Sequence, residues 1–223
     1  MCFSAEASFT SGVVLAVIGV VTLKKVQTVS QRLFAFIPLL FSIQQFTEGF
    51  LWLSLSGRAG PGIQFPATYI FLTIAQVLWP IWVPLSILVL EKEKARKKIL
   101  YVMTGIGAAV SLSIGYCLLF YSVHSKINEH HISYTLDFPL AMKMYGGVFY
   151  FIATVLPAFV SSENKMKGLA FLILTSYIIT AIFYENYVIS VWCFFAAIMS
   201  GMVYLIVRDA NVSKTPIVNT SIG

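Results

Sequence analysis

The chain has 223 residues, of which 58% are hydrophobic and only 11% charged, with 15 Lys and Arg against 9 Asp and Glu. A soluble domain carries about 25% charged residues, so this composition excludes a soluble enzyme, a disordered chain and a disulfide-rich secreted module. A mean hydropathy of +0.85 favours an integral membrane protein. The net charge of +6 comes from basic residues that flank apolar segments. We therefore expect the lipid bilayer, and not nucleic acid, as the partner.

Seven apolar runs follow one another along the chain, and each is close to the roughly 20 residues that a transmembrane helix needs. The spans are expected at residues 8–23, 33–55, 66–90, 99–121, 140–160, 168–184 and 188–207. The sequence thus predicts an all-α integral membrane protein, a seven-transmembrane-helix bundle that forms one domain over residues 1–207. Residues 208–223 are expected to form a flexible cytoplasmic tail, and the longer polar stretch at 122–137 an outer loop.

The distribution of basic residues predicts the orientation of the bundle. The loops after the first, third and fifth spans, together with the C-terminal tail, hold 12 of the 15 Lys and Arg residues, and the other side holds Arg58, Lys126 and Lys143. Basic loops stay on the cytoplasmic side of a membrane. We therefore expect the N-terminus outside and the C-terminus in the cytoplasm.

The second span contains a carboxylate at membrane depth. Gln44, Glu48 and Trp52 are spaced by four residues and so share one helix face, and Gln45 lies beside them. A carboxylate in the hydrocarbon is costly and normally points into the bundle or a wet cavity. Glu48 is therefore a candidate catalytic or proton-transfer group, a metal ligand or a ligand-binding acid. The alternative without function is a protonated or snorkelling Glu48 that is hydrogen-bonded to Gln45 or to a neighbouring hydroxyl.

Potential metal ligands are expected near the outer side of the bundle. Cys2, Cys117 and Cys193 all fall there under the predicted topology, and His131 belongs to the outer loop before the fifth span. Thiolate, imidazole and carboxylate ligands suit a transition metal such as zinc or copper, so Cys2, Glu48, His131 and Cys193 form a candidate metal site. The alternatives are a Cys2–Cys193 disulfide, small buried cysteines and a solvated loop histidine.

The third span contains Trp79 and two prolines, Pro80 and Pro84. Proline kinks a helix and leaves backbone carbonyls without their usual partners. This stretch is therefore either a broken helix that borders a cavity or a kinked helix that only packs. The residues expected to line a ligand site or cavity are Ser4, Gln44, Gln45, Trp52, Trp79 and Trp192.

Several short motifs resemble an uncharacterised bacterial membrane family, catalogued as a domain of unknown function, whose members begin Met-Cys-Phe-Ser-Ala-x-Ala-Ser. The motifs are Met1-Cys2-Phe3-Ser4-Ala5-Glu6-Ala7-Ser8, Gln44-Gln45 with Glu48-Gly49 and Trp52, Trp79-Pro80 with Pro84 and Glu91, and Trp192-Cys193-Phe194 with Ala196-Ala197. The resemblance implies a polytopic membrane fold in a bacterial inner membrane and points at Cys2, Ser4, Gln45, Glu48 and Cys193. It supplies no activity, substrate or cofactor.

Three functional hypotheses follow. The first is a site around Glu48, Cys2 and Cys193 that binds a metal and acts on or senses a hydrophobic small ligand. The second is a small transporter or channel that uses the Gln44-Gln45-Glu48 stretch and the kinked third span, and the third is a structural or accessory protein with a Cys2–Cys193 disulfide. The absence of His from every predicted span argues against a membrane zinc hydrolase that uses helical His pairs. Whether the chain is an enzyme, and its oligomeric state, are left open.

Overall fold

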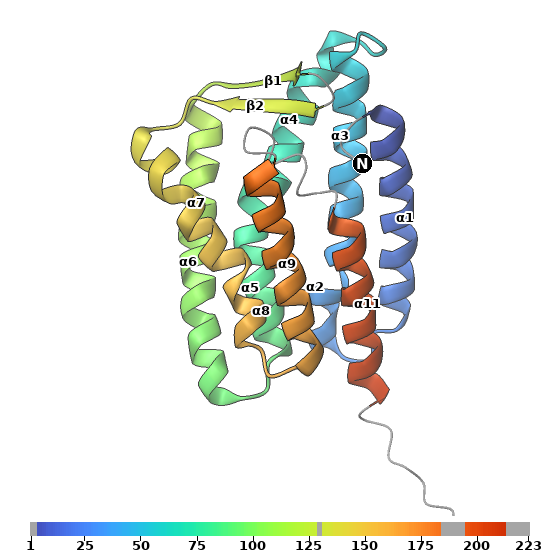
Figure 1. Ribbon diagram of the computed structural model, residues 1–223, viewed down its shortest axis with the longest axis vertical. Helices are drawn as coiled ribbons and strands as arrows, with labels where there is room; N and C mark the ends of the chain where they lie inside the picture. The colour runs from blue at the N-terminus through green and yellow to red at the C-terminus, as the bar shows by residue number, and fades with distance from the viewer. Residues whose placement is uncertain (1–3, 129–130, 184–194, 213–223) are drawn as a thin grey trace, which may run out of the picture.

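The computed structural model describes residues 4–128, 131–183 and 195–212, which form a bundle of helices with a two-stranded hairpin across one end (Figure 1). In chain order the helical elements are α1 (Ala5–Lys24), η1 (Val29–Gln31), α2 (Arg32–Ala35), α3 (Ile37–Leu55), η2 (Pro61–Ile63), α4 (Gln64–Leu72), η3 (Thr73–Leu78), α5 (Trp79–Leu90), α6 (Lys94–Phe120), α7 (Leu140–Thr154), α8 (Leu156–Val160), α9 (Asn164–Phe183) and α11 (Ala196–Val212). The strands are β1 (Val123–Asn128) and β2 (His131–Leu136).

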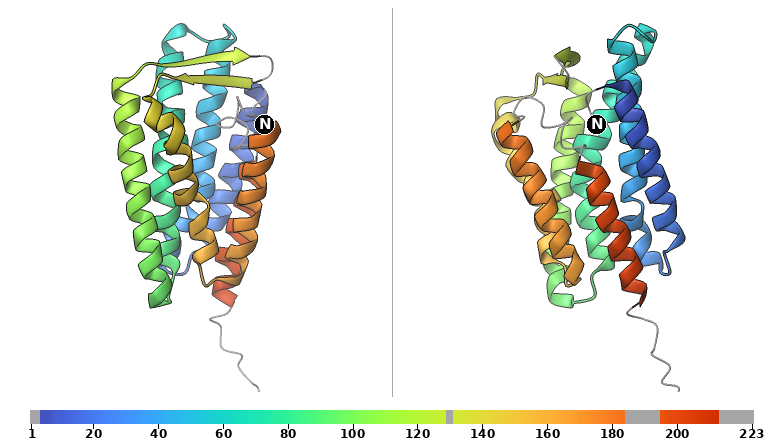
Figure 2. Two further views of the ribbon diagram at one scale, coloured as in Figure 1. Left: turned by 60° about the vertical axis from the view of Figure 1, so that its left-hand side comes forward. Right: turned by 45° about the vertical axis from the view of Figure 1, so that its right-hand side comes forward.

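Five helices or continuous helical runs of the described chain are long and apolar enough to cross a membrane. They are Ala5–Lys24, Val29–Leu55, Gln64–Leu90, Lys94–Phe120 and Leu140–Val160. Their outer faces carry exposed apolar side chains such as Val17 of α1 (59% exposed) and Leu119 of α6 (80% exposed), which suit contact with lipid. The structure is therefore that of a helical membrane protein, and α9 and α11 run along the same bundle (Figure 2).

Two of the predicted spans are interrupted just before a proline. The second predicted span divides at Phe36, between α2 and α3, and Pro38 follows two residues later. The fifth divides at Val155, between α7 and α8, two residues before Pro157. Proline has no N–H to donate and its ring crowds the carbonyl four residues earlier, which explains both breaks.

The C-terminal helix extends further toward the C-terminus than predicted. Helix α11 continues to Val212, so residues 208–212 are helical where the sequence predicted a flexible tail. Residues 213–223 lie outside the described residues.

The third membrane run changes its winding in the middle, where η3 forms a π-helical segment between α4 and α5. This segment directly precedes Trp79 and Pro80, and proline removes one donor from the helical ladder. Side chains from other helices satisfy the altered backbone: the Tyr150 hydroxyl donates to the Ala75 carbonyl at 2.6 Å, and Ser111 Oγ donates to the Val77 carbonyl at 2.6 Å. Two hydrogen bonds from α7 and α6 thus fix the wider turn.

Helix α6 approaches this proline segment very closely at Gly107. A Cβ atom added to Gly107 would lie 1.9 Å from the carbonyl oxygen of Pro80. That oxygen would normally accept from the residue four positions later, but this residue is Pro84, which has no N–H. Only glycine permits the contact, which holds α5 against α6.

The polar stretch between the fourth and fifth predicted spans is an antiparallel hairpin and not a loop as expected. Residues alternate between its two faces, with Val123 opposite Leu136 and Ile127 opposite Ile132. The inner face packs on the bundle, where Ile132 is fully buried and the Tyr134 ring stacks on Phe71 with centroids 5.1 Å apart. The hairpin therefore covers one end of the helices, as Figure 1 shows.

At the opposite end, Glu91 ties the α5–α6 connection to the α8–α9 connection. Its carboxylate, which is 2% exposed, accepts hydrogen bonds from the backbone N–H groups of Lys92, Glu93 and Ser162 and from the Ser162 hydroxyl. Burial raises the pKa of Glu91, but these four hydrogen bonds outweigh it and lower the pKa to about 2. Glu91 is therefore a charged anchor for the two connections at this end of the bundle.

Candidate functional site

The polar residues of the second span are buried inside the bundle. Gln44, Gln45 and Glu48 of α3 are 1%, 1% and 0% exposed. Gln45 Nε2 donates to Glu48 Oε2 at 3.4 Å. This is the contact that we expected if Glu48 has no functional role. Burial of these groups within the bundle is what their cost in hydrocarbon requires.

Gln44 connects α3 to the proline segment of α5. Trp79 Nε1 donates to Gln44 Oε1 at 2.9 Å, and both side chains are buried. The Phe41 ring, one helical turn before Gln44 at nearly the same face, lies against the Trp79 indole with centroids 4.3 Å apart. One hydrogen bond and one aromatic contact thus orient Trp79, at the point where the π segment ends.

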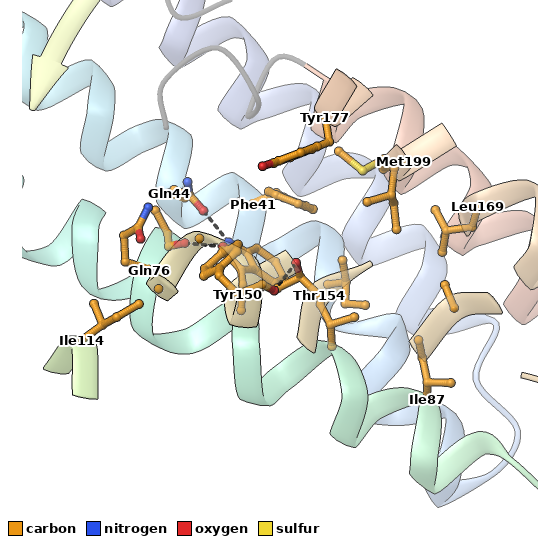
Figure 3. Close-up of a pocket in the computed structure, with 18 of the residues that line it drawn as sticks. Phe41, Gln44, Gln76, Ile87, Ile114, Tyr150, Thr154, Leu169, Tyr177 and Met199 are labelled. Carbon is orange, nitrogen blue, oxygen red and sulfur yellow. Dashed lines mark hydrogen bonds between the residues drawn. The ribbon is translucent and has the colours of Figure 1, made fainter. Parts of the chain in front are cut away.

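Trp79 and Gln44 form part of the wall of a cavity of about 310 Å³ between the helices. Its lining comes from α3, from η3 with α5, and from α7, α9 and α11, and most of the lining side chains are apolar. Figure 3 shows Phe41, Gln44, Gln76, Tyr150 and Tyr177 around this space. A volume near 300 Å³ is at the lower end of the range of small-molecule sites.

The polar groups of the cavity are few, and most of them have protein partners. The Tyr150 hydroxyl donates to the Ala75 carbonyl, Thr154 Oγ1 donates to the Tyr150 carbonyl at 2.8 Å, and Gln44 accepts from Trp79. The half-buried Gln76 of η3 makes no side-chain hydrogen bond with any described residue and lies beside Gln44 in Figure 3. The cavity therefore offers a bound molecule mostly apolar contact, with one available amide.

The predicted ligand residues separate into different places. Gln44 and Trp79 line the cavity, whereas Gln45 does not. Ser4 is the N-cap of α1, and its side chain accepts from the Ala7 backbone N–H at 3.1 Å. Trp52 is buried in a separate apolar cluster with Ala5, Leu51, Ala67 and Ile132. Trp192 lies outside the described residues.

Only two of the four predicted metal ligands, Glu48 and His131, lie in the part of the chain that the structure describes. Among residues 4–128, 131–183 and 195–212, no group of three or more His, Cys, Asp and Glu side chains is placed to hold a metal ion. Glu48 is in the bundle and His131 begins strand β2 of the hairpin. Cys2 and Cys193 lie outside the described residues, so the proposed disulfide between them lies there too.

Several cavity residues were not predicted from the sequence: Gln76, Lys143, Tyr150, Thr154 and Tyr177. Tyr150 and Thr154 are four residues apart and so share a face of the fifth span, which is a signal of the same kind as Gln44 and Glu48. Tyr177 shares a face of α9 with the cavity residues Leu169 and Ile173, and its ring contacts Phe151 of α7 with centroids 5.0 Å apart. No spacing in the sequence indicates that these helices face one cavity.

The family of the chain was identified by comparison with family models. The model described as "Family of unknown function (DUF6629)" matches residues 1–217, which confirms the resemblance to an uncharacterised domain family. No curated protein and no solved structure matches the chain.

Proposed function

Since the chain belongs to the family of unknown function DUF6629, its role follows from its own residues, and we propose that it binds a lipid-soluble apolar ligand in the membrane. The site is the cavity between α3, η3 with α5, α7 and α9. The observation that carries the proposal is the cavity itself, about 310 Å³ with a mostly apolar lining. A largely apolar pocket with a few polar groups is the usual form of a small-molecule site.

The walls of the cavity are held in place by contacts that do not need a ligand. Trp79 is oriented by Gln44 and Phe41, and η3 is fixed by the hydroxyl groups of Tyr150 and Ser111. A preformed pocket loses little side-chain freedom when a ligand binds, which favours affinity. The π-helical winding supports the proposal further, because such turns are frequent at functional sites.

The proposal does not extend to a metal site. Two of the four predicted ligands, Cys2 and Cys193, lie outside the described residues, and Glu48 is not among the residues that line the cavity. The role of Glu48 as a catalytic group stays a prediction.

The proposed topology is seven spans with the N-terminus outside. Helices α9 and α11 run along the five apolar helical runs (Figure 2), and 12 of the 15 basic residues fall on one side of such an arrangement. A fluorescent protein fused to the C-terminus tests the orientation. It fluoresces if the C-terminus is cytoplasmic, and an alkaline phosphatase fusion that is active at the same place would contradict it.

Trp79 provides a reporter for the binding test, because it lies in the cavity wall while the chain's other tryptophans are at 52, 82 and 192. In a Trp52→Phe, Trp82→Phe, Trp192→Phe protein in phosphatidylcholine nanodiscs, Trp79 is the only indole. We expect 1-bromododecane to quench its fluorescence saturably. Linear quenching that follows the bromine content of the bilayer would contradict a binding site.

A cavity-filling substitution and a matched control make this test specific. Gly147 lines the cavity, and an added Cβ there meets no atom within 4 Å, so Gly147→Leu adds volume at the cavity wall. Gly105 of α6 has equally open space but does not line the cavity, so Gly105→Leu is the control. Saturable quenching is expected to weaken in Gly147→Leu and in the second filling variant, Ile173→Phe, and to persist in Gly105→Leu. Equal quenching in Gly147→Leu, Ile173→Phe and Gly105→Leu would contradict the proposal.

A further inference from the structure

Lys143 is the one charged side chain among the described residues that line the cavity. It lies in the first turn of α7 and is exposed. The two other basic residues predicted for the outer side differ from it: Arg58 forms an ion pair with Glu6 at 2.5 Å, and Lys126 is on the exposed face of strand β1. Lys143 forms no ion pair with any described residue, so its charge is available at the edge of an apolar cavity.

Next to Lys143 along α7, the wall of the cavity contains two glycines, Gly146 and Gly147. The Met142 side chain lies over Gly146, where an added Cβ would be 2.7 Å from its Sδ, whereas an added Cβ at the exposed Gly147 meets no atom within 4 Å. The neighbours Tyr145 and Val148 are 58% and 57% exposed, as expected of a surface that faces lipid. The cavity therefore meets the bilayer-facing surface at Gly147.

Helices α7 and α9 both line the cavity but pack mainly on other helices. Helix α7 packs mainly on α5, α6 and α8, whereas α9 packs mainly on α8 and α11. Figure 1 shows the N-terminal part of α7 diverging from α9 toward the end of the bundle that carries the hairpin. Within the described chain, this side of the cavity is therefore the one with the fewest contacts between its neighbouring helices, and it is the side from which we expect a molecule in the bilayer to enter.

We propose that the ligand is a single-chain amphiphile with an anionic head, a carboxylate or a phosphate, whose head pairs with Lys143 and whose chain enters the cavity past Gly146 and Gly147. This assignment rests on the proposed function and names the ligand class for the same cavity. Charge complementarity carries it, because a lone cation beside an apolar space suits an anion attached to an apolar chain.

The dimensions of the cavity agree with a chain and not with a compact ligand. The lining residues of α7 and α8 run from Met142 to Ala158, which at the helical rise corresponds to roughly 24 Å along these helices. Trp79 and Tyr150 border the middle of this path. A chain that starts at Lys143 therefore passes the indole used as reporter.

Matched brominated probes test the head group and the cavity separately. The probes are 11-bromoundecanoate, 11-bromoundecyl phosphate and the neutral 11-bromoundecanol, each titrated into the Trp79-only protein in phosphatidylcholine nanodiscs at pH 8.5. We expect at least one anionic probe to bind about three- to tenfold tighter than the alcohol. The preference is expected to vanish in Lys143→Gln and to remain in Lys126→Gln, which removes an exposed cation outside the cavity.

The outcomes distinguish this inference from the proposed function. Saturable quenching by all three probes with equal affinity, unchanged in Lys143→Gln, would overturn the anionic head and leave the apolar cavity as a binding site. No saturable quenching by any probe would overturn both. A preference for carboxylate over phosphate, or the reverse, supports the inference and identifies the head group.

Discussion

The indole Nε1 of Trp79 donates a 2.9 Å hydrogen bond to the side-chain Oε1 of Gln44, and this bond joins α5 to α3 at the wall of the cavity. Both groups are buried, so neither can replace its partner with bulk water. Through this pair, the proline segment of α5 contacts α3, the helix that carries the polar residues Gln44, Gln45 and Glu48. The shape of the cavity and the stability of the folded protein therefore both depend on the Trp79–Gln44 pair.

Breaking this pair is expected to destabilise the protein. In Gln44→Leu the buried indole N–H loses its acceptor, which costs about 1–3 kcal/mol. Trp79→Phe removes the indole N–H, so Gln44 Oε1 loses the hydrogen bond that it accepts from Trp79. We expect the double variant to lose less stability than the sum of the single variants, as measured by unfolding in mixed micelles of increasing SDS content. Strictly additive losses would contradict the pairing.

The contact between Gly107 and Pro80 predicts a position that tolerates no side chain. Gly107→Ala places a Cβ atom 1.9 Å from the Pro80 carbonyl oxygen, so α6 must move. We expect a loss of at least about 2 kcal/mol, as for an overpacked interior, in the same unfolding measurement.

The control for Gly107 is its neighbour two positions earlier. An added Cβ at Gly105 meets no atom within 4 Å, so Gly105→Ala is expected to change stability by less than about 1 kcal/mol. Equal effects of the two substitutions would show that the close approach of α6 to Pro80 is absent.

Glu91 predicts a dependence of stability on pH. Its pKa is lowered from the ordinary 4.5 to about 2 in the folded protein, although burial alone would raise it, because four hydrogen bonds favour the carboxylate. The stabilisation is therefore fully present above pH 4.5 and is lost as the pH falls toward 2. Unfolding free energies measured between pH 6 and 3 are expected to fall by about 2–3 kcal/mol more in the wild type than in Glu91→Gln.

Glu93 serves as the comparison for Glu91. It is exposed and pairs with Arg96 at 2.5 Å on the surface, so Glu93→Gln is expected to cost less than about 1 kcal/mol and to keep the pH dependence of the wild type. If Glu91→Gln and Glu93→Gln reduce the pH dependence of the unfolding free energy equally, Glu91 is not the anchor that we describe.

The hairpin predicts a difference between its two faces. Ile132 is fully buried against the helices, and Thr135 is exposed on the other face. Ile132→Ala is expected to cost about 2–4 kcal/mol and Thr135→Ala much less, and limited proteolysis should cut the hairpin faster only in the former. Similar protease sensitivity of the two variants would indicate a hairpin that does not pack on the bundle.

The helical runs could be read from the sequence because each is a continuous apolar stretch of nearly membrane thickness. The hairpin was missed although Val123, Ser125 and Ile127 alternate with polar neighbours, since short mixed strands give a weaker signal than apolar runs. The breaks at Phe36 and Val155 were missed as well. The prolines were visible, but whether a proline bends or interrupts a helix depends on the packing around it.

The candidate site was less predictable than the fold. Gln44 and Trp79 stood out because a buried amide and an indole beside proline are unusual in a span, and the structure brings them into contact. Tyr150 and Tyr177 come from two consecutive predicted spans, and hydropathy does not tell which faces of these spans meet. Nothing in the sequence around Lys143 indicates a cavity, and its place at the cavity follows from the tertiary structure alone.

Photolabelling with an apolar diazirine tests the central claim most directly. Purified protein in phosphatidylcholine nanodiscs is irradiated with an alkyl diazirine, and the labelled residues are mapped by mass spectrometry with and without excess unlabelled bromododecane. The account predicts labels on the cavity residues Tyr150, Tyr177 and Met199 that the competitor removes, and labels on lipid-facing residues such as Leu112 and Leu119 that it does not. Labels on the lipid-facing residues alone, unaffected by the competitor, would contradict a ligand site inside the bundle.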